Sequence, residues 1–113
     1  MKNNKPIQEN IQAKILDFKN LVDYQKGSIV SRTLINKQTG TLTLFAFSQG
    51  QALSEHTAPF DAFVYVLDGK TKVIISGKPF ILKKGEAIIM PAQRPHALKA
   101  VKRFKMALVM IKS

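Results

Sequence analysis

The sequence predicts one all-β domain, an antiparallel barrel or double-sheet jelly roll that follows a short helical or irregular segment. Three observations support this fold class. The chain has 113 residues, which is the size of one small domain. From Ser28 onward, short runs rich in β-branched and aromatic residues alternate with turn residues at about the spacing of a sandwich or barrel. No helical crossover and no long internal repeat interrupts this series.

The N-terminal segment carries the one helical signal. Ile11, Ile15, Phe18 and Val22 recur at spacings of three and four residues, which is typical of one face of a helix. We therefore expect a short helical turn that packs on another element. Residues 1–27 are predicted to form an arm on the barrel, and residues 28–113 the barrel itself.

The predicted strands follow in order, and glycine or proline separates most of them. Glycine reaches the positive φ that tight turns often need, and proline cannot donate to a central ladder. Asp68-Gly69 is predicted to be one such turn. The strands are expected at residues 28–35, 41–48, 62–67, 71–76, 80–82, 87–90, 96–101 and 104–111.

The charge of the chain is strongly positive, with 18 Lys and Arg against 7 Asp and Glu and a net charge of +11. Clustered basic residues would indicate a nucleic-acid partner. Here they are scattered, mostly as lysines beside turns or alternating with apolar residues. This is typical of a solvated strand face, so we expect no nucleic-acid partner.

Composition also restricts the possible metal ligands and indicates where the protein is located. The chain has no cysteine, which excludes disulfides and thiolate ligands, so we expect any metal to be held by nitrogen or oxygen. No apolar run approaches the roughly 20 residues that span a bilayer, and the first residues lack the features of a signal peptide. We expect a cytoplasmic protein with no membrane contact.

Two stretches carry the functional information, and the first begins at Gly50. Five residues separate Gly50 from His56, Ala58 follows two positions later, three residues then precede Ala62, and six more precede Gly69.

The second stretch begins at Gly85. Five residues separate Gly85 from Pro91, which is followed by Gln93, then by His96 and Ala100.

Together these stretches resemble the two motifs of the cupin superfamily, Gly-x5-His-x-His-x3–4-Glu-x6-Gly and Gly-x5-Pro-x-Gly-x2-His-x3-Asn. The resemblance covers about residues 42–111 and implies a small single-domain cupin, whose fold is a β-barrel of jelly-roll type. In metal-binding cupins, the three histidines and the glutamate bind one divalent cation inside the barrel.

The resemblance also implies an incomplete set of metal ligands. His56 and His96 occupy the first and last ligand positions, whereas Ala58 and Ala62 replace the middle histidine and the glutamate. Two imidazoles are fewer than the three or four protein ligands that zinc sites usually have. We therefore expect no tight metal site.

Asp61 is the one nearby residue that would add a carboxylate. Successive side chains of a strand point to opposite faces, so Asp61 points away from an inward Ala62 unless the strand starts one residue later or bulges. A weak Zn, Ni, Mn or Fe site, formed by His56, His96 and Asp61 or water, stays open. The alternatives are a metal-free pocket with two histidines and histidines that only make structural hydrogen bonds.

The predicted ligand pocket is lined by His56, Ala58, Ala62, Val64 and His96. Replacing a histidine and a glutamate by alanine makes the barrel mouth more open and more apolar. A mostly apolar cavity with a few polar groups is typical of a small-molecule site. A small organic molecule, with an aromatic or acidic group for example, is therefore the expected partner.

Phe63, Tyr65 and Leu67 form the opposite face of the same strand, and this face is also apolar. A strand that is apolar on both faces is usually covered on both. The resemblance implies pairing through sheet contacts, so we expect a homodimer.

Two functions of different classes follow from these patterns. The first is binding of a small molecule in a cupin barrel without tight metal. The second is a metal-dependent cupin enzyme, of dioxygenase or isomerase type, with a weak metal centre of two histidines completed by water. The fold does not choose between them.

Overall fold

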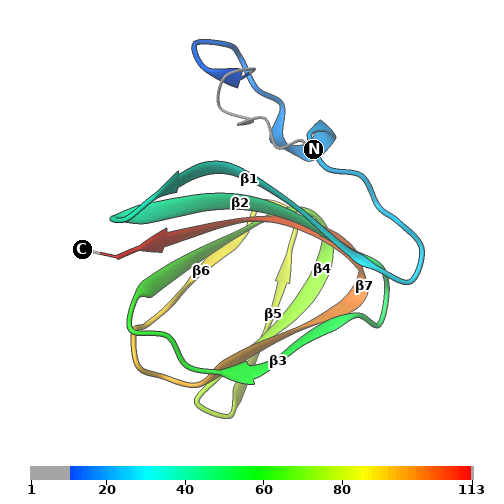
Figure 1. Ribbon diagram of the computed structural model, residues 1–113. Helices are drawn as coiled ribbons and strands as arrows, with labels where there is room; N and C mark the ends of the chain where they lie inside the picture. Colours follow the sequence, from blue (N-terminus) through cyan, green and yellow to red (C-terminus); the bar gives the residue numbers. More distant parts are fainter. Residues whose placement is uncertain (1–10, 113) are drawn as a thin grey trace.

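Seven antiparallel strands curl into a barrel (Figure 1). The structure is a computed structural model that describes residues 11–112. The all-β jelly-roll class predicted from the sequence is confirmed. The strands are β1 (Ile29–Lys37), β2 (Gly40–Phe47), β3 (Ala52–His56), β4 (Asp61–Ile75), β5 (Lys78–Lys83), β6 (Ala87–Met90) and β7 (His96–Ile111).

Two long strands, β4 and β7, belong to both layers of the barrel. The end of β7 pairs with β2 and with the first half of β4, whose other neighbour is β6. The start of β7 pairs with β3 and with the second half of β4, whose other neighbour is β5. One layer therefore has the order β1-β2-β7-β4-β6 and the other β3-β7-β4-β5.

The chain changes layers at a corner within β4, where a turn was predicted. That prediction is wrong, because Asp68-Gly69 lies inside the strand. The register against β7 shifts on both sides of Gly69, and such bulges bend a strand without ending it. Gly69 has φ 79°, and a Cβ there would lie 1.9 Å from the carbonyl oxygen of Arg103. Only glycine is compatible with this corner. The predicted strands 96–101 and 104–111 are likewise one strand, β7.

β3 was not predicted as a strand. It pairs with β7 alone, and four of its five residues are exposed. An exposed edge strand lacks the regular apolar alternation by which strands are found in a sequence.

The arm, of which residues 11–27 are described, is largely irregular. Its one regular element after Ile11 is a short 3-10 helix, η1 (Phe18–Asn20). Ile11, Phe18 and Val22 pack on the outer face of the barrel as expected, but Ile15 is fully exposed. The predicted helical turn is not continuous, because Ala13 has φ 59°, outside the helical range.

Tyr24 fixes this arm to the corner of the barrel. Its hydroxyl donates to Oδ2 of Asp68 over 2.7 Å. The cationic groups of Arg103 and Lys105 lie 4.5 and 4.9 Å from the centre of its ring. Burial, and then Asp68, raise the pKa of Tyr24 well above its usual range. Lys105 also donates from Nζ to the backbone carbonyl of Lys19 over 2.7 Å.

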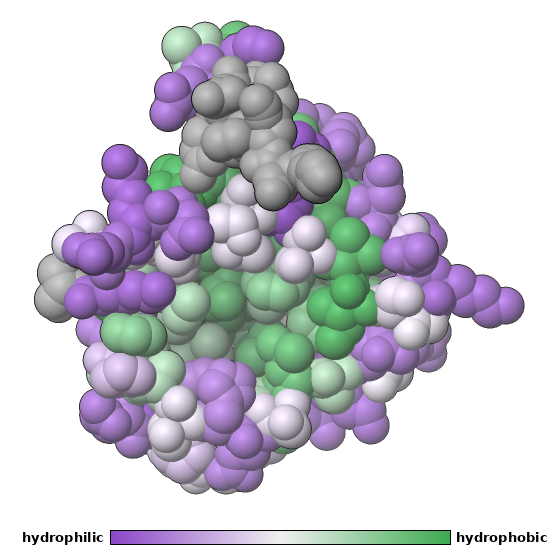
Figure 2. Space-filling model, in the orientation of Figure 1, coloured by the Kyte–Doolittle hydropathy of each residue, from purple (hydrophilic) through white to green (hydrophobic). Residues whose placement is uncertain are grey.

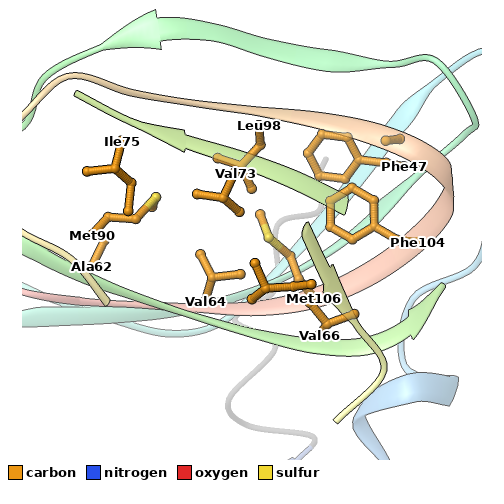
Figure 3. Packing of buried hydrophobic residues seen from close by; sticks show 12 residues of the cluster. Phe47, Ala62, Val64, Val66, Val73, Ile75, Met90, Leu98, Phe104 and Met106 are labelled. Atoms are coloured by element: carbon orange, nitrogen blue, oxygen red, sulfur yellow. The ribbon is translucent and has the colours of Figure 1, made fainter. Parts of the chain in front are cut away.

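The core lies between the two layers (Figure 3). Ala62, Val64 and Val66 point inward from β4 and are at most 4% exposed. Figure 2 shows hydrophobic residues in the hollow between the layers and hydrophilic residues around it.

The opposite face of β4 is covered only in part. Leu67 packs in the cluster under the arm, but Phe63 and Tyr65 are each 39% exposed. Phe63 pairs with Ile89 and Val109 on the neighbouring strands, and Ile89 is 62% exposed. An apolar area thus remains on the outer face of this layer. Among the described residues, no helix is long and apolar enough to cross a bilayer.

Candidate functional site

The histidines of the two motifs meet at the mouth of the barrel. His56 ends β3, His96 begins β7, and the two residues are paired in register. Their ring centroids lie 4.4 Å apart, with the ring planes at 68°. His96 is only 5% exposed, whereas His56 is exposed. The pair therefore has one buried ring and one at the solvent.

Hydrogen bonds to the backbone define how each ring is protonated. Nδ1 of His56 lies 2.9 Å from the carbonyl oxygen of Ser54, and Nδ1 of His96 lies 3.2 Å from that of Arg94. A carbonyl oxygen only accepts hydrogen bonds, so Nδ1 carries the hydrogen in each ring. In the neutral form, each Nε2 keeps its lone pair and is free to accept a hydrogen bond or to bind a metal.

The surroundings of His96 favour this neutral form. Burial lowers the pKa of His96, and the nearby His56 lowers it further, although the hydrogen bond to the Arg94 carbonyl acts in the opposite direction. The buried ring is therefore an acceptor at Nε2, not a cation, at neutral pH.

A cavity of about 60 Å³ lies beside the two rings. Four of the five predicted pocket residues line it, namely His56, Ala58, Ala62 and His96. Val64 does not line it; this side chain points inward but is fully buried in the core.

Asp61 is not brought to the histidines. β4 begins at Asp61, so strand alternation directs Ala62 inward and Asp61 to the opposite face. Oδ1 of Asp61 instead accepts a hydrogen bond from the backbone N–H of Ala92 over 2.8 Å. Within residues 11–112, no three or more His, Cys, Asp or Glu side chains are grouped so that they could hold a metal ion.

The remaining lining residues were not found from the sequence. They are all apolar, namely Leu53, Met90, Leu98, Met106, Leu108 and Met110. The alternation along residues 104–111 places Met106, Leu108 and Met110 on one face, since every second residue of a strand shares a face. Leu53 had no such signal, because β3 was not predicted.

Gln93 stands where the second motif has glycine, and its backbone shows the consequence. Its φ is 67°, in the left-handed region that glycine favours. Its N–H donates to the carbonyl oxygen of Ala58 over 2.8 Å. Gln93 thus takes a strained backbone conformation, and its hydrogen bond helps to hold the pocket residue Ala58 in place.

A larger cavity, of about 410 Å³, lies between the arm and the outer face of β1 and β2. It is lined mainly by apolar side chains, and Lys37 is its one titratable residue. The smaller cavity is the candidate site, because the two imidazoles converge there on an otherwise apolar space.

Comparisons with known proteins agree on the fold. Residues 43–112 match the sequence profile of the cupin domain. A conserved protein of unknown function from Streptococcus pyogenes is 37% identical with a TM-score of 0.86, and the match covers 90% of each chain. A cupin 2 conserved barrel domain protein from Leptotrichia buccalis is 46% identical with a TM-score of 0.81, covering 83% of this chain and 46% of that one. Polyketide synthase CurC from Streptomyces cyaneus is 26% identical over 99 residues. The match covers 82% of this chain and 64% of that protein, so the chain spans less than two thirds of its length.

Proposed function

The chain belongs to the cupin domain family, and from this premise we propose that its barrel binds a small organic molecule through His56 and His96, without a tightly bound divalent metal. One observation carries the proposal: two imidazoles, each held through Nδ1 by a backbone carbonyl, converge on an otherwise apolar cavity. A cavity of this composition is typical of small-molecule sites.

The donors present do not match the divalent metal of metal-binding cupins. Ala58 and Ala62 line the cavity but offer no ligand atoms. The carboxylate of Asp61 is directed to the other face and bound to the backbone of Ala92. Two imidazoles leave a divalent ion without the third and fourth ligands that hold it tightly.

The size of the cavity restricts the ligand. An apolar cavity of about 150 Å³ accommodates benzene, whereas this one measures about 60 Å³. The ligand therefore has few non-hydrogen atoms, or it displaces part of the wall. Met90, Met106 and Met110 supply a wall that can move, because the unbranched methionine side chain adapts its shape readily.

The ligand also needs a hydrogen-bond donor. Each free Nε2 is an acceptor, and the lowered pKa of His96 opposes formation of an imidazolium cation. A hydroxyl, an amide N–H or an undissociated acid satisfies this requirement.

The test uses pairs of molecules that differ only in the donor, such as phenol and toluene, within a set of small alcohols, phenols and acids. Since the chain contains only two histidines, NMR signals from imidazole rings belong to His56 and His96, and His56→Gln assigns them. We expect at least one donor-bearing molecule to shift the His96 signals while its hydrocarbon counterpart does not. If the whole set leaves both rings unaffected, the proposal is refuted.

A weak metal centre in a dioxygenase- or isomerase-type enzyme is the second candidate. The observation that favours it is the hydrogen bond from each Nδ1 to a carbonyl, since metal-binding histidines generally donate their other ring nitrogen in this way. Elemental analysis of protein purified without a histidine tag separates the two candidates. Near-stoichiometric divalent metal would favour the enzyme.

We also propose that the chain is a homodimer. Phe63, Tyr65 and Ile89 form an apolar area on the outer face that the described part of the arm leaves exposed. A second copy of this face would cover it.

A further inference from the structure

Every methionine in the described chain lines the same cavity as the histidine pair. The chain has four methionines, and apart from Met1, which lies outside the described residues, these are Met90, Met106 and Met110. Met90 and Met110 are the two cross-strand neighbours of Ala62. Met90 and Met106 both point into the space between the two layers (Figure 3).

These side chains bring thioether sulfur to a site where only nitrogen and oxygen donors were expected from the sequence. Met90 is 3% exposed and Met106 is fully buried, so their sulfur atoms are protected from water. A thioether is a neutral, soft donor, and so is compatible with soft metal ions. The cavity is therefore lined by two imidazole side chains and three thioether side chains.

The charge of the donor groups restricts the charge of a metal ion that this cavity could hold. The cavity is lined by two histidines and eight apolar residues, so it offers imidazole and thioether groups, which bind metals as neutral ligands, and no carboxylate. The free energy needed to bury an ion rises with the square of its charge, and a buried ion without an opposite charge is strongly unfavourable. A neutral donor set inside an apolar wall thus disfavours a divalent ion and is better suited to a monovalent one.

We propose that this pocket binds a soft monovalent metal ion, Cu(I), through Nε2 of His56 and His96 and the sulfur of at least one of Met90, Met106 and Met110. This goes beyond the proposed function, which needs only the two histidines. A cavity of about 60 Å³ has room for a single ion without displacement of its wall. The adaptable methionine side chains allow sulfur to approach the ion while the backbone stays in place.

The first measurement is Cu(I) affinity of the full chain, in the absence of oxygen, by competition with a chromophoric Cu(I) chelator. We expect one Cu(I) per chain and far weaker binding of Zn(II) under the same conditions. The triple variant Met90→Leu, Met106→Leu and Met110→Leu keeps the apolar volume and removes all three sulfurs. We expect it to bind Cu(I) at least about tenfold more weakly, which corresponds to about 1.4 kcal/mol. His96→Ala should also weaken binding.

A matched control adds a thioether elsewhere. Leu34 is buried under the arm, outside this cavity, and Leu34→Met should leave Cu(I) affinity unchanged. If the triple variant does not fold, the single variants Met90→Leu and Met110→Leu make the same test. X-ray absorption at the copper edge provides an independent readout, since wild-type protein should show sulfur as well as nitrogen bound to the metal.

Several outcomes would overturn the proposal. They are no stoichiometric Cu(I) binding, unchanged affinity in the folded triple variant, or a copper spectrum without sulfur. In each of these cases the methionines only fill the core. The proposed binding of an organic molecule fails separately, because its test follows the His96 ring without metal and compares donor and hydrocarbon molecules.

Discussion

Replacing Gly69 by alanine should disrupt the corner at which β4 passes from one layer of the barrel to the other. A Cβ at this position would lie 1.9 Å from the carbonyl oxygen of Arg103 and 2.7 Å from Cα of Phe104. Both are backbone atoms of β7, so no side-chain rotation relieves the overlap. The two longest strands must move apart.

Two effects add up in this variant. A residue other than glycine in the left-handed region costs about 1–2 kcal/mol, and Gly69 has φ 79°. Forcing extra atoms into a packed site costs about 1–3 kcal/mol. We therefore expect Gly69→Ala to lower the free energy of unfolding by about 2–5 kcal/mol.

Gly77→Ala is a matched control. Gly77 has φ 81°, but no heavy atom lies within 4 Å of the position of its missing Cβ. Gly77→Ala should therefore lower the free energy of unfolding only by the cost of the left-handed backbone, about 1–2 kcal/mol. Urea denaturation followed by circular dichroism gives both values, provided that the dependence of the unfolding free energy on urea is similar in all variants. Equal losses in Gly69→Ala and Gly77→Ala would refute the close approach of β4 and β7 at the corner.

Four further predictions concern the site and the assembly. Gln93→Gly should raise the free energy of unfolding by about 0.5–1 kcal/mol, since relief of positive φ outweighs the added freedom of the unfolded chain; a lower urea midpoint would contradict this. Light scattering should give wild-type protein twice the mass of one chain and Phe63→Glu the mass of one, and a monomeric wild type would remove the dimer. The folded pKa of His96 lies below its ordinary 6.5, so the unfolded chain takes up the proton first as pH falls. The stability due to neutral His96 should be present above about pH 6.5 and be lost as pH falls towards the folded pKa; NMR titration gives that pKa, and a dependence equally steep in His96→Gln would exclude this origin. Ala58→His combined with Ala62→Glu should strengthen binding of Zn(II), Ni(II) or Mn(II) in calorimetry far more than either change alone, and a gain that persists after His96→Ala would show that these positions do not share one ion.

The spacing of the motif residues places most of the expected residues at one cavity, because this spacing follows strand alternation. Four of the five predicted residues line the cavity, since Ala62 and the two histidines take their directions from β4, β3 and β7. Val64 is the exception. It faces inward as expected, but the pattern of a strand gives the face of a side chain and not its depth in the barrel.

Other features depend on contacts that local sequence does not encode. Asp68-Gly69 has the same local chemistry whether it forms a hairpin turn or a bulge, and only the pairing with β7 decides between them. Ile15 matches the helical spacing of the arm, but Ala13 takes a positive φ and Ile15 points to solvent. Met90 was not predicted to line the pocket because it lies on β6, which reaches the residues of β7 only through their shared neighbour β4 in the folded barrel.

The pairing of β4 with β7 also orders the steps by which the barrel can form. The pairs are nested, with Ile75 opposite His96 at one end and Asp61 opposite Ile111 at the other. The loop closed at the Ile75 end is the shorter, so its closure loses less chain entropy, and each later pair extends a ladder that already exists. The favoured route starts at the histidine mouth and proceeds through the corner to the outer apolar face. The register of the pocket is then established before the outer apolar face of Phe63 and Tyr65 is complete.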